Sequence, residues 1–186
     1  MEVMLADEFA PVTIERLLKR YGPGRRRTRM EPIYRAVLAE AEPIGQPVAI
    51  YEEIELRQVP ELLPWLPAET TYLFLALCSL GYPLQEHFVH LAQDDILSAA
   101  VLDEITLTWV TALTRQVHGK IRAQVGQLGL KAGAAYRPGV GRWPLAAQNV
   151  VFAHLPADAI AVTIDENLVM SPRHSTSLII PVLDRR

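Results

Sequence analysis

The sequence predicts an α+β protein in which a mixed, mainly antiparallel twisted sheet is covered by helices. Helical and extended patterns interleave without the regular spacing of βαβ units. Residues 70–79 are almost uniformly apolar, which is typical of a buried strand, and residues 96–128 carry an apolar stripe at helical spacing. With 186 residues, half of them hydrophobic, the chain can bury one substantial core. We expect a single unit over residues 1–186, with a helical N-terminal part at 1–45 and an α+β core at 46–186.

Two short helices are predicted in the N-terminal part. The first covers residues 12–20, with Thr13 as a candidate cap. A Gly-Pro-Gly stretch at 22–24 ends it, and a loop is expected to carry the basic residues Arg25, Arg26, Arg27 and Arg29. The second helix is expected over residues 31–40, with Pro32 in the first turn, where its missing N–H costs nothing.

The middle of the chain is predicted to be extended. Residues 48–59 alternate loosely and contain β-branched side chains, which indicates one extended segment or two short strands. Three prolines between 60 and 67 predict a rigid connector. The stretch TTYLFLALCS at 70–79 is rich in strand-forming residues and is followed by Gly81, so we predict a buried central strand.

After Pro83 the apolar period becomes helical, with Leu84, Phe88 and Leu91 at positions i, i+4 and i+7. A longer helix follows over residues 96–128. Pro144 is suited to open a further helix, which ends before Pro156. The remaining predictions are an edge strand at 130–136, that helix at 144–155, and strands at 160–164 and 175–183.

The bulk properties exclude several classes of protein. A net charge of −3 gives no general reason to expect binding to nucleic acid or an anionic membrane. Cys78 is the single cysteine, so neither an internal disulfide nor a multi-cysteine metal site can form. The first residues are acidic where a secretory signal is basic, and no apolar run approaches the ~20 residues that span a bilayer. We therefore expect a cytoplasmic protein that binds neither nucleic acid nor membrane.

The loop Pro138-Gly139-Val140-Gly141 is a candidate ligand site. Its two glycines permit positive φ and let backbone amides approach a ligand closely. A turn between a strand and a helix, without any ligand, explains the same spacing. The loop matches neither a dinucleotide-binding fingerprint nor a P-loop. The acidic pair Asp165-Glu166 is open to the same two interpretations: a contact for an ammonium or ribose group, or a solvated turn.

Other candidate chemistry is weaker. His87 and His90 have helical i, i+3 spacing, but no third metal ligand is near and both are expected to face solvent. The cluster Arg25–Arg29 suits either a phosphate or acidic partner surface, such as that of a flavodoxin, or a solvated loop. No Gly-x-Ser-x-Gly motif supports a hydrolase, and Cys78 is expected in the core.

Two ordered motifs resemble a known family. The first is Pro138-Gly139-Val140-Gly141-Arg142-Trp143-Pro144-Leu145, followed by Gln148; the second runs from Asp165-Glu166 through Met170-Ser171-Pro172 to Ser175-Thr176-Ser177. This order resembles the activation (reactivation) domain of vitamin B12-dependent methionine synthase, in a free-standing form. The resemblance extends over about residues 17–182 and is specific over 136–177.

The resemblance implies an accessory component of a cobalamin-dependent methyltransferase system for methionine biosynthesis, rather than a complete enzyme. Members bind S-adenosylmethionine in a shallow groove along the sheet edge and dock over the cobalamin of a corrinoid-binding protein or methionine synthase. A flavodoxin-type donor supplies an electron to the oxidised cobalt, which is then remethylated. The protein positions the reacting methyl group, while the cofactor carries the hard chemistry.

Carried over residue by residue, the family pattern gives a binding loop, an acidic contact at Glu166, and a set of supporting residues. The loop residues are Tyr136, Arg137, Pro138, Gly139 and Val140; the supporting residues are Gly141, Trp143, Met170 and Pro172. No catalytic residue and no metal ligand are implied.

The chain departs from the family pattern at three expected contacts. Ala135 occupies the place of an arginine, Val140 that of a tyrosine, and Thr111 that of a glutamate on the long helix. Arg137 is a candidate replacement for the arginine, although a displaced guanidinium must be re-aimed to hold a carboxylate. An alternative function follows: a module that no longer binds S-adenosylmethionine but still docks on a corrinoid protein.

Overall fold

The structure, a computed structural model that describes residues 2–4, 9 and 12–184, contains a five-stranded sheet in the order β1-β2-β3-β7-β4. All of its strand pairs are antiparallel. A separate two-stranded hairpin is formed by β5 and β6. The strands are β1 (Glu2–Met4), β2 (Val48–Glu55), β3 (Thr70–Ser79), β4 (Lys131–Ala132), β5 (Thr163–Ile164), β6 (Met170–Ser171) and β7 (Ser175–Leu183).

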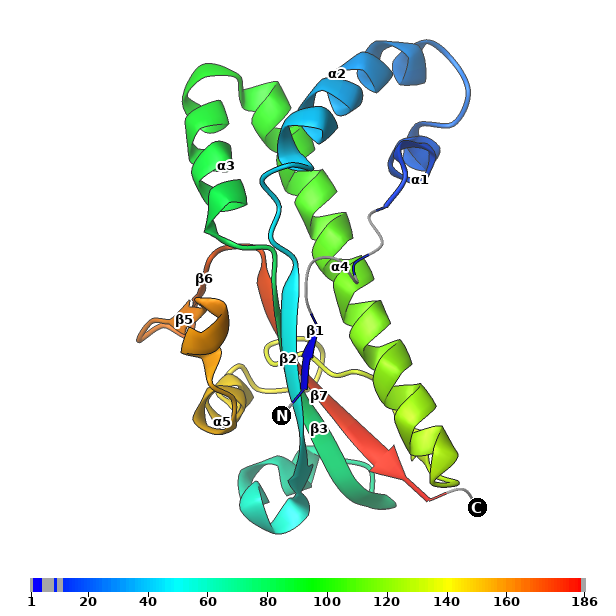
Figure 1. Cartoon of the computed structure of the whole chain (residues 1–186), viewed down its shortest axis with the longest axis vertical. Helices are drawn as coiled ribbons and strands as arrows, with labels where there is room; N and C mark the ends of the chain where they lie inside the picture. Colours follow the sequence, from blue (N-terminus) through cyan, green and yellow to red (C-terminus); the bar gives the residue numbers. More distant parts are fainter. Residues whose placement is uncertain (1, 5–8, 10–11, 185–186) are drawn as a thin grey trace.

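Helices lie on both sides of this sheet (Figure 1). The α-helices are α1 (Ile14–Leu18), α2 (Arg25–Ala41), α3 (Tyr82–Asp94), α4 (Ile96–Gln127) and α5 (Ala147–His154). Short 3₁₀ helices are η2 (Lys19–Tyr21), η3 (Leu56–Gln58), η4 (Pro60–Trp65) and η5 (Ala157–Ile160). The predicted α+β class, with a mainly antiparallel twisted sheet covered by helices, is confirmed.

Strand β3 is apolar at nearly every position because both of its faces are covered. Phe74, Ala76 and Cys78 face the core on the α4 side, whereas Leu73 and Leu75 face the core on the α5 side. Successive side chains of a strand point to opposite faces, so a strand buried on both sides needs apolar residues at every position. The prediction of a buried central strand at 70–79 is therefore confirmed.

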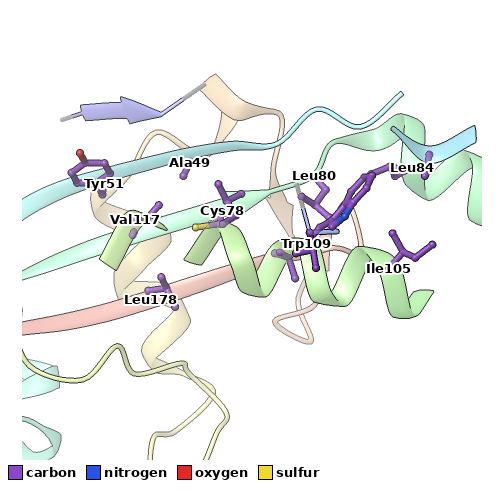
Figure 2. Close-up of a cluster of buried hydrophobic side chains, with 14 of the residues drawn as sticks. Ala49, Tyr51, Cys78, Leu80, Leu84, Ile105, Trp109, Val117 and Leu178 are labelled. Carbon is purple, nitrogen blue, oxygen red and sulfur yellow. The ribbon is translucent and has the colours of Figure 1, made fainter. Parts of the chain in front are cut away.

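The long helix α4 crosses the sheet diagonally and forms the larger core. Its N-terminus is capped by Asp95, whose Oδ1 accepts from the N–H groups of Leu97 and Ser98, both at 3.1 Å. Figure 2 shows Trp109 of α4 on the same side of the sheet as Cys78 of β3. Within the described chain, α4 is long and apolar enough to cross a membrane, but half of its most apolar window is buried in the protein, as expected of a core helix.

Helix α5 covers the other face with help from the short helices. Val151 and Leu155 of this segment pack with Leu62 of η4 and Ile160 of η5 against β2, β3 and β7. The resulting three layers place the sheet between α4 and α5. The segment that joins β4 to α5 must therefore pass around the β7 edge of the sheet, and this segment contains the Pro-Gly loop.

The arginine cluster is where the predicted fold is wrong. Arg25, Arg26, Arg27 and Arg29 lie in the first turns of α2 rather than in a loop, and Pro32 lies inside the helix. The sequence predicts a helix start near Pro32 because proline favours the first turn. The helix instead begins about two turns earlier, directly after Gly24, because arginine is itself a good helix former.

The other differences concern element ends. The segment 48–59 contains one strand followed by η3, and the connector after it is largely the 3₁₀ helix η4. The expected edge strand at 130–136 is reduced to β4 and a single bridge between Tyr136 and Ile179. The strand expected at 160–164 keeps two residues, and β1 and β6 were not predicted.

Candidate functional site

The Pro-Gly loop begins where the chain leaves the edge of the sheet. Tyr136 exchanges both backbone hydrogen bonds with Ile179 of β7, each at 2.9 Å. Two successive turns follow, in which the N–H of Val140 donates to the carbonyl of Arg137 at 3.1 Å and the N–H of Gly139 to that of Trp143, also at 3.1 Å. The loop is therefore held by its own backbone.

Gly139 is the position where this loop needs glycine. Its φ is +79°, a left-handed conformation that side chains with a Cβ avoid. A Cβ placed there would lie 3.1 Å from Cδ1 of Leu145. Gly141 also has positive φ, +63°, but nothing lies within 4 Å of its added Cβ. The first glycine thus fixes the turn against the residues that lead into α5.

An aromatic pair anchors the loop to the α5 side of the sheet. The rings of Tyr136 and Trp143 stack with centroids 4.9 Å apart and planes inclined by 28°. Trp143 is buried, and among the described residues its indole N–H has no hydrogen-bond partner. The stack packs the start of the loop against Trp143.

Arg137 turns to the opposite side and lies against α4. Its guanidinium donates to Oγ1 of Thr114 at 3.3 Å, and Thr114 in turn donates to the carbonyl of Thr111 at 2.8 Å. The same guanidinium is close enough to Cys78 to lower the pKa of its thiol, although burial dominates and raises that pKa to about 12. Arg137 therefore occupies the helix surface on which Thr111 lies.

Beside Arg137, the edge of β7 continues without a strand partner. Because Ile179 directs both backbone groups towards Tyr136, the alternation of an antiparallel strand directs those of Ser177 and Ser175 to the same edge. Within the described chain, the backbone groups of Ser177 have no hydrogen-bond partner on that edge. The loop thus ends next to a short run of free strand donors and acceptors.

The acidic turn is held by Asp165 rather than by Glu166. Oδ1 of Asp165 accepts from the N–H groups of Asn167 at 2.9 Å and Val169 at 2.8 Å, which closes the β5–β6 hairpin. Glu166 is exposed at its tip. Within the described residues, no hydrogen bond or ion pair joins Glu166 to the Pro-Gly loop.

Gln148 connects this hairpin to the sheet. Its side chain is buried, donates from Nε2 to the carbonyl of Leu168 at 2.8 Å, and accepts from Oγ of Ser177 at 3.3 Å. The hairpin therefore docks on the α5 side, whereas Arg137 points to the α4 side. The two predicted ligand contacts, Arg137 and Glu166, are not brought into one cluster.

The remaining predicted residues divide into buried supports and exposed contacts. Pro138 and Pro172 are buried, and Met170 is half-buried against the α5-side core. Val140 is 60% exposed, so a larger side chain has room there. The sequence analysis does not predict the contacts that Thr114 and Ser177 make. The position of Thr114, one helical turn after Thr111, is the pattern that points to it.

Two surface pockets adjoin these elements. One of about 420 Å³ lies between η4 and α5 and is lined by Pro144, three residues after Gly141. The other, of about 390 Å³, is lined by Asp165 and Met170 of the hairpin and by Arg173. Neither of these two pockets is lined by Arg137 or Val140.

The two histidines of α3 differ in exposure. His90 is exposed, as predicted, but the side chain of His87 is only 23% exposed, and its Nε2 lies 3.2 Å from Oε2 of Glu40 on α2. The expectation that His87 faces solvent is therefore wrong, because α2 packs beside it. In the described part of the chain, no three His, Cys, Asp or Glu side chains gather as metal ligands would.

Comparison with known proteins identifies the fold. No protein-family model and no curated protein matches the sequence. Among solved structures, the chain is similar to the MetH reactivation domain bound to AdoHcy, with a TM-score of 0.63 and 11% identity. The match covers 97% of this chain and 78% of that domain. At this identity the likeness shows the fold: the chain has the fold of the MetH reactivation domain.

Proposed function

We propose that this chain binds S-adenosylmethionine on the surface formed by the loop Tyr136–Val140, α4 and the free edge of β7. The observation that carries the proposal is the position of Arg137, whose guanidinium lies against Thr114 of α4 beside unpaired backbone groups of β7. The fold adds support, because the similar MetH reactivation domain was solved with AdoHcy.

The chemistry of this surface suits the ligand. An arginine guanidinium binds a carboxylate through two parallel hydrogen bonds. The contact of Arg137 with Thr114 is long, 3.3 Å, and engages one of its nitrogens, which leaves donors for a carboxylate. The free N–H and C=O groups of β7 suit an extended ligand that runs along a sheet edge. We assign Arg137 to the carboxylate and Glu166 to the cationic or ribose end, which requires an extended ligand that crosses the β7 edge from the α4 side towards the hairpin on the α5 side.

The three positions that depart from the family pattern affect the proposed binding in different ways. Ala135, which replaces the family's arginine, is half-buried against the α4-side core. Arg137 reaches α4 from two residues further along, so it supplies the positive charge in place of residue 135. Thr111 offers no negative charge to the ligand's ammonium group, and Val140 offers no ring, so we expect weaker binding than a full set of contacts would give.

We further propose that the chain acts as an accessory component rather than a complete enzyme. Its partner would be a corrinoid-binding protein or methionine synthase, with a flavodoxin-type electron donor, in a reducing cytoplasm. Cobalamin on the partner would supply the cobalt that accepts a methyl group. This chain's own contribution would be to hold and orient the ligand with its sulfonium methyl exposed.

Isothermal titration with S-adenosylmethionine, and with S-adenosylhomocysteine for comparison, tests the proposal. We expect saturable binding by the wild type and about tenfold or greater weakening in Arg137→Gln, because a charged hydrogen bond contributes about 1.5–3 kcal/mol. Glu166→Ala should also weaken binding. Arg29→Gln is the matched control, since Arg29 is exposed and its helix, α2, lies away from the loop (Figure 1). Equal affinity in Arg137→Gln and Arg29→Gln would refute the assignment.

A docking module without ligand binding is the second candidate function, favoured by Ala135, Val140 and Thr111. In that case the wild type gives no heat and no thermal shift with either ligand. The double variant Val140→Tyr, Ala135→Arg then discriminates: binding gained by the variant identifies a site that has lost its ligand. Val140→Tyr alone is a useful companion, because residue 140 is exposed whereas residue 135 packs on the core.

A further inference from the structure

The positive charge of this protein is concentrated in one segment. Residues 14–30 contain seven of the chain's 18 Lys and Arg residues but only one of its 21 Asp and Glu residues, Glu15, which gives the segment a net charge of +6. The other residues therefore carry −9, which accounts for the overall −3. The weak net charge of the whole chain conceals two regions of opposite sign. We call the seven cations the basic surface: Arg16, Lys19, Arg20, Arg25, Arg26, Arg27 and Arg29.

The fold assembles this surface from α1, η2 and the first turns of α2. Arg20 forms an ion pair with Glu104 of α4. Arg20 and Arg26 also lie over the ring of Tyr21, at 5.5 and 5.2 Å from its centroid. The Tyr21 hydroxyl is 3.1 Å from that of Tyr34, a buried residue of α2. Two of the seven cations thus fix the surface to the core.

The other five cations have no acidic partner among the described residues. Four of them are exposed and Arg27 is half-buried. Their position is electrostatically unfavourable for the helix, because the N-terminal turn of a helix prefers acidic side chains and α2 has none there. Arg25 and Arg29 are also like charges at i, i+4 spacing, which repel each other. Charge interactions within the fold therefore give no reason for these arginines.

We propose that the basic surface docks an acidic face of another protein. Arginine-rich surfaces bind carboxylate-rich ones by complementary charge, and this complementarity accelerates association and selects the partner. The surface has no exposed large apolar side chain that would enter a lipid bilayer, among the residues described. Its one aromatic ring, Tyr21, lies under arginines and offers no face for base stacking. The remaining residues carry a net charge of −9. They repel the parts of a long polyanion, such as duplex DNA, that extend past the basic surface.

The basic surface is remote from the proposed ligand site. Figure 1 shows α1 and α2 at one end of the molecule, with the Pro-Gly loop (yellow) in the other half. A partner docked on α1 and α2 therefore leaves the loop accessible. The inference does not depend on S-adenosylmethionine binding, and either can fail without the other.

Fluorescence anisotropy with a labelled poly-glutamate peptide of about eight residues, short enough to stay on the basic surface, tests the inference in salt raised from about 20 to about 150 mM. We expect binding that weakens with salt, and about tenfold or greater loss of affinity in Arg25→Gln/Arg27→Gln/Arg29→Gln. The matched control, Arg115→Gln/Arg122→Gln/Lys131→Gln, removes the same charge from exposed positions on α4 and β4 and should bind as the wild type does. Parallel titrations use duplex DNA and vesicles containing phosphatidylserine.

The thermal stability of the triple α2 variant separates a docking role from a structural one. Because the three arginines oppose the helix dipole and lack partners, the variant should melt at the same temperature as the wild type or higher. The inference is overturned by any of three results: equal loss of peptide affinity in the control, unchanged affinity in the α2 variant, or tighter binding to DNA or vesicles than to the peptide.

Discussion

Nε2 of His174 lies 2.8 Å from Oγ1 of Thr106, and this contact joins the start of β7 to α4. The Thr106 hydroxyl donates to the carbonyl of Leu102 at 2.8 Å, so the imidazole must be the donor to Thr106. Oδ1 of Asp103, 3.1 Å away, accepts from the same N–H. His174 is therefore neutral and protonated on Nε2, with a buried Nδ1 that has no partner among the described residues.

The pH dependence of stability should reveal this histidine. Burial lowers the pKa of His174 below its ordinary value of 6.5, and the nearby Asp103 only partly opposes this. Between the two pKa values the unfolded chain binds more protons than the folded chain, so the free energy of unfolding decreases as the pH falls below about 6.5. Urea unfolding followed by circular dichroism at several pH values between about 7.5 and 5 measures the decrease.

His174→Gln should flatten that pH dependence, since glutamine keeps a donor but cannot take up the extra proton. His90→Gln is the control, because His90 is exposed on α3. If the free energy of unfolding of His174→Gln and His90→Gln falls with decreasing pH as steeply as that of the wild type, the buried imidazole does not cause the pH dependence.

Cys78 should be inert towards thiol reagents in the native state. Its pKa is about 12 because it is fully buried, so almost no thiolate is present at pH 8. We expect no reaction with Ellman's reagent at pH 8 and reaction of one thiol per chain after unfolding in guanidinium chloride. Rapid labelling of the folded protein would contradict the described packing of β3 against α4.

Two glycines should respond in opposite ways to alanine. Gly81 has φ +84°, and a Cβ there would lie 2.8 Å from Cβ of Gln46, so Gly81→Ala should cost about 2–4 kcal/mol of unfolding free energy. Gly119 lies in α4 with nothing within 4 Å of an added Cβ, so Gly119→Ala should stabilise by about 0.5–1 kcal/mol. Chemical denaturation of both variants gives the comparison, and a stabilising Gly81→Ala would be incompatible with this turn.

Gln148 should control the position of the acidic hairpin. Gln148→Leu removes the donor to Leu168 and the acceptor for Ser177, at a cost of about 1–3 kcal/mol for buried polar groups left unpaired. Hydrogen exchange of the β5–β6 hairpin should accelerate. Asn149→Leu, an exposed neighbour, should leave that exchange unchanged. Equal exchange in the two variants would mean that other contacts hold the hairpin.

The elements that the sequence predicted well are those whose pattern reflects burial along their whole length. β3 is apolar at nearly every position because both faces are covered, and α4 repeats apolar residues because one side of a long helix faces the sheet. Both were placed within about one residue. β1 and β6 were missed because strands of two or three residues exist only through their partners, β2 and β5.

The sequence predicts which segment forms the candidate site but not how its side chains are arranged. The glycine spacing and the Trp-Pro pair marked the loop, and the structure confirms a tight turn that depends on positive φ at Gly139. The direction of Arg137 towards α4 was out of reach, because it depends on which face each residue presents after the bridge between Tyr136 and Ile179. Glu166 lies on the other side of the sheet from Arg137 because Gln148 holds its hairpin on the α5 side.

The register of β3 against β7 also bears on how the protein is made. Ser79 of β3 pairs with Ser175 of β7. Strand β3 therefore gains its second neighbouring strand only after roughly a hundred further residues have been synthesised. Until then β3, apolar on both faces, has one edge unpaired and α4 has only part of its sheet to rest on. During synthesis β3 therefore keeps one edge unpaired while the residues from α3 to β7 are added, and an unpaired apolar edge is a place where a growing chain can aggregate.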